Sequence, residues 1–261
     1  MPDIYTKVLL HSNGVDGGAI VDEIGHSFSV HDSAALVTAE KQFGSASLRL
    51  DQDGVESAIY TAQHADFNLG PKEMGWGVDF WIRYASLPGS GFSRTFVSQH
   101  NIVDGIENWR MYLQCTSGIY SLRYVARDLV GNPLVTVNKN IATPNFLQWY
   151  HIAITAEPIL NNRAFRWFID GIQQSTEVQD DSTIVDSNGP LWIGGDIAET
   201  WRGVDAWMDE FRLSVGSYRW NANFVPPTEE YNGTPVGPTM AQLMRQRKWF
   251  NNGIFQGYYL G

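Results

Sequence analysis

The acidic residue with the most distinctive setting is Asp209, which lies in the alternating segment 207–213. Strict strand alternation places its carboxylate on the same face as Trp207, Phe211 and Leu213, which is the apolar face. A carboxylate on that face needs hydrogen-bond donors or a cation. Two interpretations stay open: backbone N–H groups of the opening loop bind Asp209, or Asp209 ligates a structural Ca²⁺.

Two loops rich in glycine and aspartate are suited to complete such a calcium site. They are residues 13–17, which include Asp16, and residues 22–25, which begin with Asp22. Calcium takes carboxylate and backbone carbonyl oxygens, and such loops offer both. Their spacing does not match an EF-hand loop. A calcium ion held by Asp209, Asp16 and Asp22 is therefore one expectation, and a metal-free structural carboxylate is the other.

Aromatic and cationic side chains in loop-like surroundings suggest a second kind of chemistry, the binding of a sugar ring. The candidate ligand-binding residues are Trp201, Arg202, Trp220 and Phe92, and Phe92 follows the Gly-rich stretch 89–91. Aromatic rings beside hydrogen-bond donors suit glycan recognition and protein interfaces equally well. For Trp220, packing against the sheet is the alternative.

The sequence lacks the common motifs of catalysis. A retaining glycosidase needs two carboxylates about 5 Å apart, and no Glu-x-Asp-x-Glu run that would place them on one strand face is present. The Gly-x-Ser-x-Gly, His-Glu-x-x-His and Walker patterns are also absent. The single cysteine, Cys115, lies in an alternating strand, where a lone thiol is usually a small core residue. We therefore expect a protein that is not an enzyme.

The composition indicates a folded chain that binds no nucleic acid and does not insert into membranes. The 261 residues include 10 Trp, 11 Tyr and 13 Phe, which is ample apolar material for a core. Acidic residues outnumber basic residues by 28 to 18, whereas phosphate contacts need clustered Lys and Arg. No segment has the roughly 18 consecutive apolar residues of a membrane helix. The opening residues show no classical export signal.

Most of the chain has the pattern of short strands. Period-2 segments rich in aromatic and β-branched residues are bounded by Gly, Asn, Asp and Pro. These segments are residues 7–11, 47–50, 78–84, 109–115, 120–126, 149–154, 165–169, 191–193 and 207–214. The dipeptide Asp170-Gly171 between two strand-like runs is typical of a type I′ hairpin. The sequence therefore predicts an all-β fold, a two-sheet antiparallel sandwich, that occupies residues 1–231 as one domain.

The composition changes after this domain. Residues 232–238 form a Gly/Pro linker, and residues 239–261 form a short C-terminal extension with a capping box, helical spacing of apolar residues and an aromatic end. A helix of about a dozen residues is marginal alone, so the extension is expected to attach to its own sandwich or to a partner. The expected partner-binding residues are Met240, Leu243, Met244, Arg245, Arg247, Lys248, Trp249 and Phe250.

Eight segments resemble, in the same order, the laminin-G-like, concanavalin A-like jelly-roll family. They are VLLHSNGVDG at residues 8–17, QFGSASL at 42–48, DFNLG at 66–70, VDFWIR at 78–83, WYHIA at 149–153, FIDG at 168–171, LWIGG at 191–195 and MDEFRL at 208–213. The resemblance covers about residues 7–231 and implies a jelly-roll sandwich. At Tyr150 the chain departs from the His-His-Val-Ala pattern of the family, so a role for paired histidines has no support.

The form of the family that the chain resembles is common in bacteriophage structural proteins. The resemblance implies a virion protein that is made in the host cytoplasm and displayed on the particle surface. Its expected partners are other virion proteins or further copies of itself. The resemblance also implies calcium at Asp209, because in jelly-roll relatives an aspartate of the closing strand often binds calcium with the N-terminal segment.

Three functional hypotheses follow from this resemblance. The first is a non-enzymatic virion structural protein, associated with the tail or a fibre, whose lectin-like module binds host-surface glycan or protein. The second is a capsid-associated decoration protein that binds only virion proteins. The third is a polysaccharide-degrading enzyme, since the same sandwich carries glucanases in related families. Fold alone does not decide among them.

Overall fold

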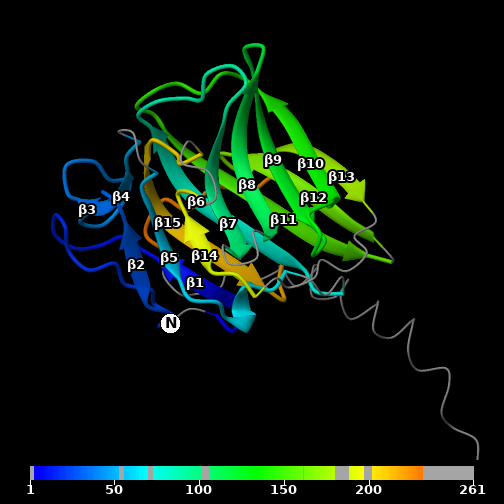
Figure 1. The fold of residues 1–261 in the computed structure, drawn as a ribbon, viewed down its shortest axis with the longest axis horizontal. Coiled ribbons are helices and arrows are strands. Elements are labelled where there is room, and N and C mark those ends of the chain that lie inside the picture. The colour runs from blue at the N-terminus through cyan, green and yellow to red at the C-terminus, as the bar shows by residue number, and fades with distance from the viewer. Residues whose placement is uncertain are drawn as a thin grey trace, which may run out of the picture.

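The structure is a computed structural model, and it describes residues 3–52, 56–69, 73–101, 106–160, 162–179, 188–196 and 202–231. Within these ranges the chain forms fifteen strands and one 3-10 helix, η1 (Ala65–Phe67). The strands build two antiparallel sheets that face each other as two layers (Figure 1). The predicted all-β, two-sheet antiparallel sandwich is confirmed. Across the described ranges, no helix has the length and apolar character needed to cross a membrane.

The larger sheet has eight strands and contains both the first and the last strand. Its order is β13, β12, β11, β6, β15, β4 and β3, and β1 pairs with β15. The strands are β1 (Thr6–Leu10), β3 (Ala35–Val37), β4 (Ser47–Leu50), β6 (Trp76–Tyr84), β11 (Trp149–Ile159), β12 (Asn162–Ile169), β13 (Ile172–Gln179) and β15 (Ala206–Val215). The predicted hairpin joins β12 to β13, with φ of 49° at Asp170 and 72° at Gly171.

The smaller sheet has seven strands, in the order β10, β9, β8, β7, β14, β5 and β2. The strands are β2 (Phe28–His31), β5 (Ala58–Thr61), β7 (Ser93–Asn101), β8 (Ile106–Thr116), β9 (Ile119–Arg127), β10 (Pro133–Ile141) and β14 (Leu191–Ile193). The short strand β14 lies between β7 and β5, and so it brings residues near 190 beside residues near 60 and 98.

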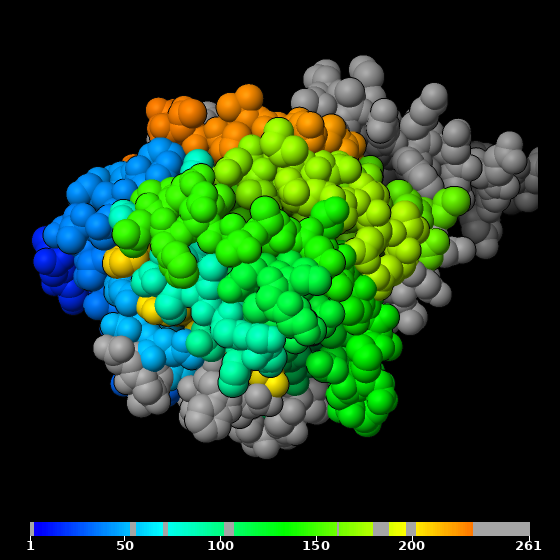
Figure 2. Space-filling model, turned by 90° about the horizontal axis from the view of Figure 1, so that it is seen from above, coloured from blue at the N-terminus to red at the C-terminus, as the bar shows by residue number. Residues whose placement is uncertain are grey.

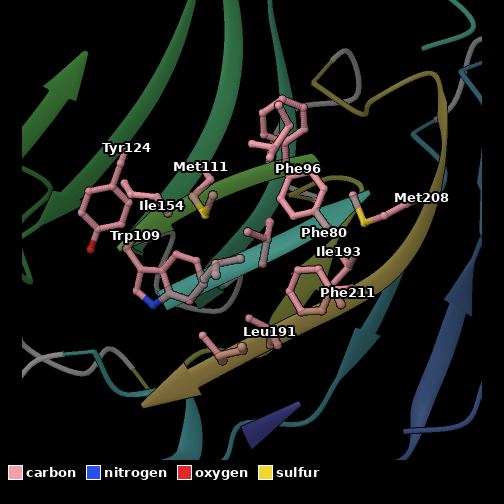
Figure 3. Close-up of a cluster of buried hydrophobic side chains, with 14 of the residues drawn as sticks. Phe80, Phe96, Trp109, Met111, Tyr124, Ile154, Leu191, Ile193, Met208 and Phe211 are labelled. Carbon is pink, nitrogen blue, oxygen red and sulfur yellow. The ribbon is translucent and has the colours of Figure 1, made fainter. Parts of the chain in front are cut away.

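The core fills the space between the two sheets. Figure 3 shows side chains of β6 and β15 meeting side chains of β7, β8 and β14. The ring centroid of Phe80 lies 5.3 Å from that of Phe96 and 6.2 Å from that of Phe211. Burial of each large apolar side chain contributes about 2 to 3 kcal/mol relative to exposure. The core therefore gives the surface loops a rigid support.

A bulge at Glu210 changes the face on which the side chains of β15 lie. The residues that face the core have even numbers up to Met208 and odd numbers from Phe211 onward. The pairing register with β6 shifts here, Glu210 has a φ of 51°, and the partner on the other side of β15 changes from β4 to β1. The prediction of strict alternation is therefore wrong, because Asp209 lies on the opposite face from Phe211 and Leu213.

The outer face of the larger sheet is covered by residues 217–231. Trp220 stacks on Phe224 with ring centroids 4.1 Å apart, and both pack against Ala153 and Phe168 of the sheet. In Figure 2 this segment, coloured orange, lies against the yellow-green strands β12 and β13. The segment is therefore part of the sandwich, although it contains no strand.

A buried ion pair lies under this covering segment. The Nε and Nη2 atoms of Arg212 donate to both carboxylate oxygens of Asp79, at 3.0 and 2.8 Å. His151 Nε2 lies 3.0 Å from the Tyr231 hydroxyl and 3.5 Å from Asp79. Burial opposes the charge of Asp79, but Arg212 holds the pKa of Asp79 below its usual value. The network therefore connects Tyr231 to strands β6, β11 and β15.

The linker 232–238 and the extension 239–261 lie outside the described residues. The attachment role of the eight residues from Met240 to Phe250 is therefore a prediction that the structure does not test.

Candidate functional site

The structure does not bring Asp209, Asp16 and Asp22 together. Across the described part of the chain, these three acids form no group whose carboxylate oxygens lie close to one another. Each carboxylate accepts backbone N–H groups instead. Calcium itself stays a prediction.

Asp209 is fully buried and accepts three backbone hydrogen bonds. Its Oδ2 accepts from Gln42 and Phe43 at 3.0 Å each, and its Oδ1 accepts from Glu210 at 2.9 Å. Burial raises the pKa of Asp209 to about 7, although the N–H donors oppose that shift. The interpretation as a hydrogen-bonded carboxylate therefore has a geometric basis. Two of the donors precede β4 and the third belongs to β15, so none of them belongs to the opening loop.

The other two acids accept backbone hydrogen bonds from segments outside their own loops. Asp22 is buried, and its Oδ1 accepts from the backbone of Leu9 at 2.8 Å while its Oδ2 lies 2.6 Å from His26 Nδ1. Asp16 is exposed and accepts from the backbone of Thr38 at 2.6 Å. Both carboxylates therefore brace the connections near β1 and β3.

Arg202 belongs to a buried ionic cluster on the outer face of the smaller sheet. Its Nη1 lies 3.8 Å from Glu107 Oε2 and 3.7 Å from Asp196 Oδ2, and Arg110 contacts the same two acids at 3.3 and 3.2 Å. Glu56 Oε1 accepts from the backbone of Asp196 at 2.5 Å. Burial raises the pKa of Glu56 to about 7 and that of Asp196 to about 6. The three acids are less than one-tenth exposed, so they offer little surface to a glycan.

The aromatic candidates do not form one site. Trp220 is only 7% exposed and packs against the larger sheet, which agrees with the packing alternative and not with ligand binding. Phe92 is 55% exposed and precedes β7 of the smaller sheet. Trp201 lies outside the described residues.

A groove of about 370 Å³ lies at one end of the sandwich, beside the connection from β10 to β11. Residues 142–148 form one wall, and the Leu147 N–H donates to the Tyr84 carbonyl at 3.3 Å, which ties this wall to β6. The groove is lined by Tyr84, Ile141, Ala142, Thr143, Pro144, Asn145, Gln148, Tyr150, Ile152, Ile169 and Gln174. We call this feature the 141–150 groove.

The 141–150 groove combines aromatic rings with amide groups. The Tyr150 hydroxyl accepts from the backbone of Asn145 at 2.9 Å, and Asn145 Nδ2 donates to Gln148 Oε1 at 3.2 Å. The Gln174 side chain belongs to β13 and also lines the groove. These hydrogen bonds hold the amides in place while leaving donors and acceptors for a ligand.

The hydroxyl of Tyr84, a residue of both the core and the groove lining, is one of many buried polar atoms that have no partner among the described residues. It is buried and makes no hydrogen bond in the part of the chain that the structure describes. Burial raises the pKa of Tyr84 above its usual value, so the group is a neutral hydroxyl. The hydroxyl exposes almost no surface, so Tyr84 offers its ring and not its hydroxyl to a ligand in the groove.

The sequence analysis missed this groove. Its residues come from five strands and one connection, and none of the segments has a ligand-binding motif. The one visible signal is Tyr150, which stands where the jelly-roll family pattern has the first of two histidines.

Comparison with known proteins identifies the family to which the chain belongs. Residues 52–217 match the family described as the concanavalin A-like lectin/glucanases superfamily. The chain belongs to this superfamily. The match includes every residue that lines the 141–150 groove and the strands from β5 to β15. No curated protein matches the chain at a significant level.

Solved structures of similar fold include binding domains of toxins and a domain of a glycoside hydrolase. The binding domain of Paraclostridial Mosquitocidal Protein 1 is 18% identical, with a TM-score of 0.59, and the match covers 95% of this chain and 53% of that one. A botulinum neurotoxin type C structure is 11% identical, with a TM-score of 0.53 over 93% of this chain and 51% of that one. The present chain thus spans about half the length of each of these toxin chains.

Domain 4 of AbnA, an extracellular GH43 arabinanase from Geobacillus stearothermophilus, is 15% identical, with a TM-score of 0.53. This match covers 80% of the present chain and 93% of the arabinanase domain, which was solved in complex with arabinotriose. At these identities the likeness shows the shared fold of the superfamily.

Proposed function

We propose that the protein is a non-enzymatic structural protein of a bacteriophage virion, associated with the tail or a fibre, and that it binds host-surface glycan in the 141–150 groove. The observation that carries the binding part is the lining of the groove, in which the ring of Tyr150 lies beside the amides of Asn145, Gln148 and Gln174. A sugar hydroxyl both donates and accepts hydrogen bonds, and so it suits these amide groups.

The lining of the 141–150 groove has the chemistry that sugars require. The rings of Tyr84 and Tyr150 lie 6.5 Å apart between centroids, and Asn145, Gln148 and Gln174 add amide donors and acceptors. The apolar C–H face of a sugar packs on aromatic rings while its hydroxyls bond to amides. The volume of about 370 Å³ falls in the range of small-ligand sites, roughly 300 to 1,000 Å³.

The same lining favours binding over hydrolysis. Among the described residues, those that line the groove include no Asp, Glu or His. Hydrolysis of a glycoside needs a pair of carboxyl groups on either side of the bond. The ionisable pair with raised pKa values, Glu56 and Asp196, belongs to the buried ionic cluster on the smaller sheet instead. A lectin-like module is therefore favoured over a polysaccharide-degrading enzyme.

Structures of similar fold support a binding role. The arabinanase domain binds arabinotriose, and cell entry of botulinum neurotoxin type C depends on interaction with two ganglioside molecules. Because this chain spans about half of the toxin chain, the identity of its own glycan does not follow from the toxins. Support for the virion setting comes from the ordered segments between residues 8 and 213 that resemble bacteriophage structural proteins.

The experiment that tests the binding proposal is a screen of host capsule and lipopolysaccharide oligosaccharides against the wild type and Gln148→Ala. Gln148→Ala removes an exposed amide of the groove, so we expect an unchanged melting temperature and at least a tenfold loss of glycan affinity. Gln63→Ala, which removes an exposed glutamine outside the groove, is the matched control and should bind as the wild type does.

Three outcomes would contradict the proposal. Equal affinity of the wild type and Gln148→Ala would place the glycan elsewhere. Cleavage of an oligosaccharide would favour the enzyme hypothesis. Absence of glycan binding, together with a position on the capsid in a particle reconstruction, would favour the decoration protein.

A further inference from the structure

A cluster of two histidines and one aspartate lies beside η1, away from the 141–150 groove. We propose that His26, His64 and Asp66 bind a divalent transition-metal ion such as Zn²⁺. The three side chains offer ligand atoms that all lie within 4.8 Å of one another, and the structure describes no other such group of three. Asp66 Oδ2 lies 3.1 Å from His64 Nδ1 and 3.5 Å from His26 Nε2.

These distances suit a shared metal ion. Zinc binds histidine nitrogen and carboxylate oxygen at about 2.0 to 2.2 Å in tetrahedral geometry, which separates neighbouring ligands by about 3.3 Å. The two measured separations from Asp66 lie close to that value. His64 is exposed enough, at 54% for its side chain, to rotate toward the other two ligands. Water would fill the fourth position.

A second, independent observation is the support that Asp22 gives to His26. Asp22 is buried, and its Oδ2 lies 2.6 Å from His26 Nδ1 and accepts from the His26 backbone N–H at 3.0 Å. With Nδ1–H donated to Asp22, the lone pair of a neutral His26 is on Nε2, which is the atom that faces Asp66. Carboxylates that orient a metal-binding histidine in this way are a regular feature of zinc sites.

The donor set selects the class of metal. Two imidazole nitrogens and one carboxylate oxygen suit Zn²⁺, Ni²⁺ or Cu²⁺, whereas Ca²⁺ takes six to eight oxygen ligands. The charged neighbour that competes with a metal is Lys7, whose Nζ lies 3.5 Å from Asp66 Oδ1. His64 Nδ1 also accepts from the Asp66 backbone at 3.2 Å. As an acceptor, Nδ1 carries the lone pair that a metal needs, and a metal ion would replace the amide N–H as its partner.

A metal ion here would link two loops that are distant in the sequence. His26 lies just before β2, and His64 and Asp66 lie at η1 after β5. The rings of His26 and His64 also pack near the buried Phe67, with centroids 5.1 and 6.0 Å from it. Metal binding would therefore stabilise the end of the sandwich where β2 and β5 are the outermost pair of the smaller sheet.

The test is a titration of the full chain, freed of metals with a chelator, with ZnCl₂. We expect one equivalent to bind and the melting temperature to rise by about 5 °C or more at 100-fold excess over the dissociation constant. Co²⁺ should give the visible absorption of a four-coordinate site. His64→Ala and Asp66→Asn should each weaken Zn²⁺ binding at least tenfold, while His31→Ala, a histidine outside the cluster, should bind as the wild type does.

Other results would overturn the proposal. If no equivalent of Zn²⁺ binds, the cluster is a network of hydrogen bonds that holds no metal. If His64→Ala binds zinc as tightly as the wild type, or if His31→Ala loses binding equally, the metal lies elsewhere. A shift produced equally by Ca²⁺, and abolished by His64→Ala, would contradict the transition-metal assignment.

Discussion

At the scale of single residues, the buried carboxylates of this sandwich differ in how completely they are hydrogen-bonded. Asp209 serves as an acceptor for three backbone N–H groups, and Glu56 is buried beside another acid in the ionic cluster. Burial raises the pKa of both carboxyl groups. Both oxygens of Asp209 accept hydrogen bonds, whereas Glu56 Oε2 has no partner among the described residues. Removal of the two carboxylates should therefore have opposite effects on stability.

Asp209→Ala should lower the free energy of unfolding. The variant leaves the backbone N–H groups of Gln42, Phe43 and Glu210 without their acceptor inside the protein. Unpaired buried donors cost about 1 to 3 kcal/mol, so a loss of that order is expected in chemical denaturation. Asp16→Ala, which removes an exposed acceptor of a single N–H group, is the control and should have a smaller effect. Equal stability of Asp209→Ala and wild type would contradict the assigned role.

Glu56→Gln should change how stability depends on pH. Folding raises the pKa of Glu56 from 4.5 to about 7. The contribution of Glu56 to the free energy of unfolding is therefore most favourable below pH 4.5 and is lost as the pH rises through 7. When the pH rises from 4 to 8, the free energy of unfolding of Glu56→Gln should thus increase by on the order of 2 kcal/mol relative to that of the wild type. Denaturation at both pH values measures this difference. Glu73→Gln, at an exposed site, is the control and should show no such difference. If the free energy of unfolding of Glu56→Gln relative to the wild type is the same at pH 4 and pH 8, burial does not raise the pKa of Glu56.

At the scale of elements, the hairpin of β12 and β13 is held by the covering segment 217–231. The backbone N–H of Phe224 donates to the Gly171 carbonyl at 2.9 Å, and a Cβ atom on Gly171 would overlap the Phe224 carbonyl. Gly171 also has a positive φ, at 72°. The turn residue is thus fixed both by its own conformation and by the segment that crosses it.

Gly171→Ala should destabilise the protein more than Gly118→Ala. Gly118 occupies the same turn position in the β8–β9 hairpin, with a φ of 80°, but has open space where a Cβ would lie. Gly118→Ala should cost only the backbone strain of about 1 kcal/mol, and Gly171→Ala should cost about 2 kcal/mol or more. Equal melting temperatures of the two variants would show that residues 217–231 do not pack tightly on this hairpin.

The elements also show how far the sequence predicts this molecule. Strands with buried alternating faces, such as 78–84 and 149–154, were predicted because their pattern has a period of two. The predicted segments did not include β2, β3, β5, β7 and β10. Of these, β2, β3 and β10 lie at sheet edges, where a strand needs few apolar residues. The bulge at Glu210 was missed because a single inserted residue leaves no mark in composition, and it reversed the face assigned to Asp209.

The candidate sites were harder to predict than the fold for a related reason. Arg202 was chosen from its own neighbourhood, but its contact Glu107 comes from the distant strand β8, and its contact Asp196 lies after β14. The 141–150 groove likewise needs Tyr84 and Gln174, which are 90 positions apart in the sequence and meet only through sheet order. Local spacing predicts strands and turns, whereas a groove between strands depends on which strands become neighbours.

At the scale of the whole molecule, the sandwich is a rigid acidic body whose attachment is expected to lie outside it. The body spans the described residues up to 231, and the predicted linker and attachment segment follow. A chain that ends at Asn232 should stay folded and monomeric yet fail to incorporate into particles, because the residues from Met240 to Phe250 are missing. Circular dichroism, sedimentation and particle assembly check these expectations. Normal incorporation would place the attachment surface on the sandwich.

The central claim is that glycan binds in the 141–150 groove. Hydrogen–deuterium exchange of the full chain, with and without the tightest-binding oligosaccharide of the screen, tests the location directly. The account predicts slower exchange in residues 141–150 and at Gln174, and unchanged exchange in the β8–β9 hairpin, which contributes no residue to the groove. Slower exchange around Arg202 and Asp196, with residues 141–150 unaffected, would contradict it.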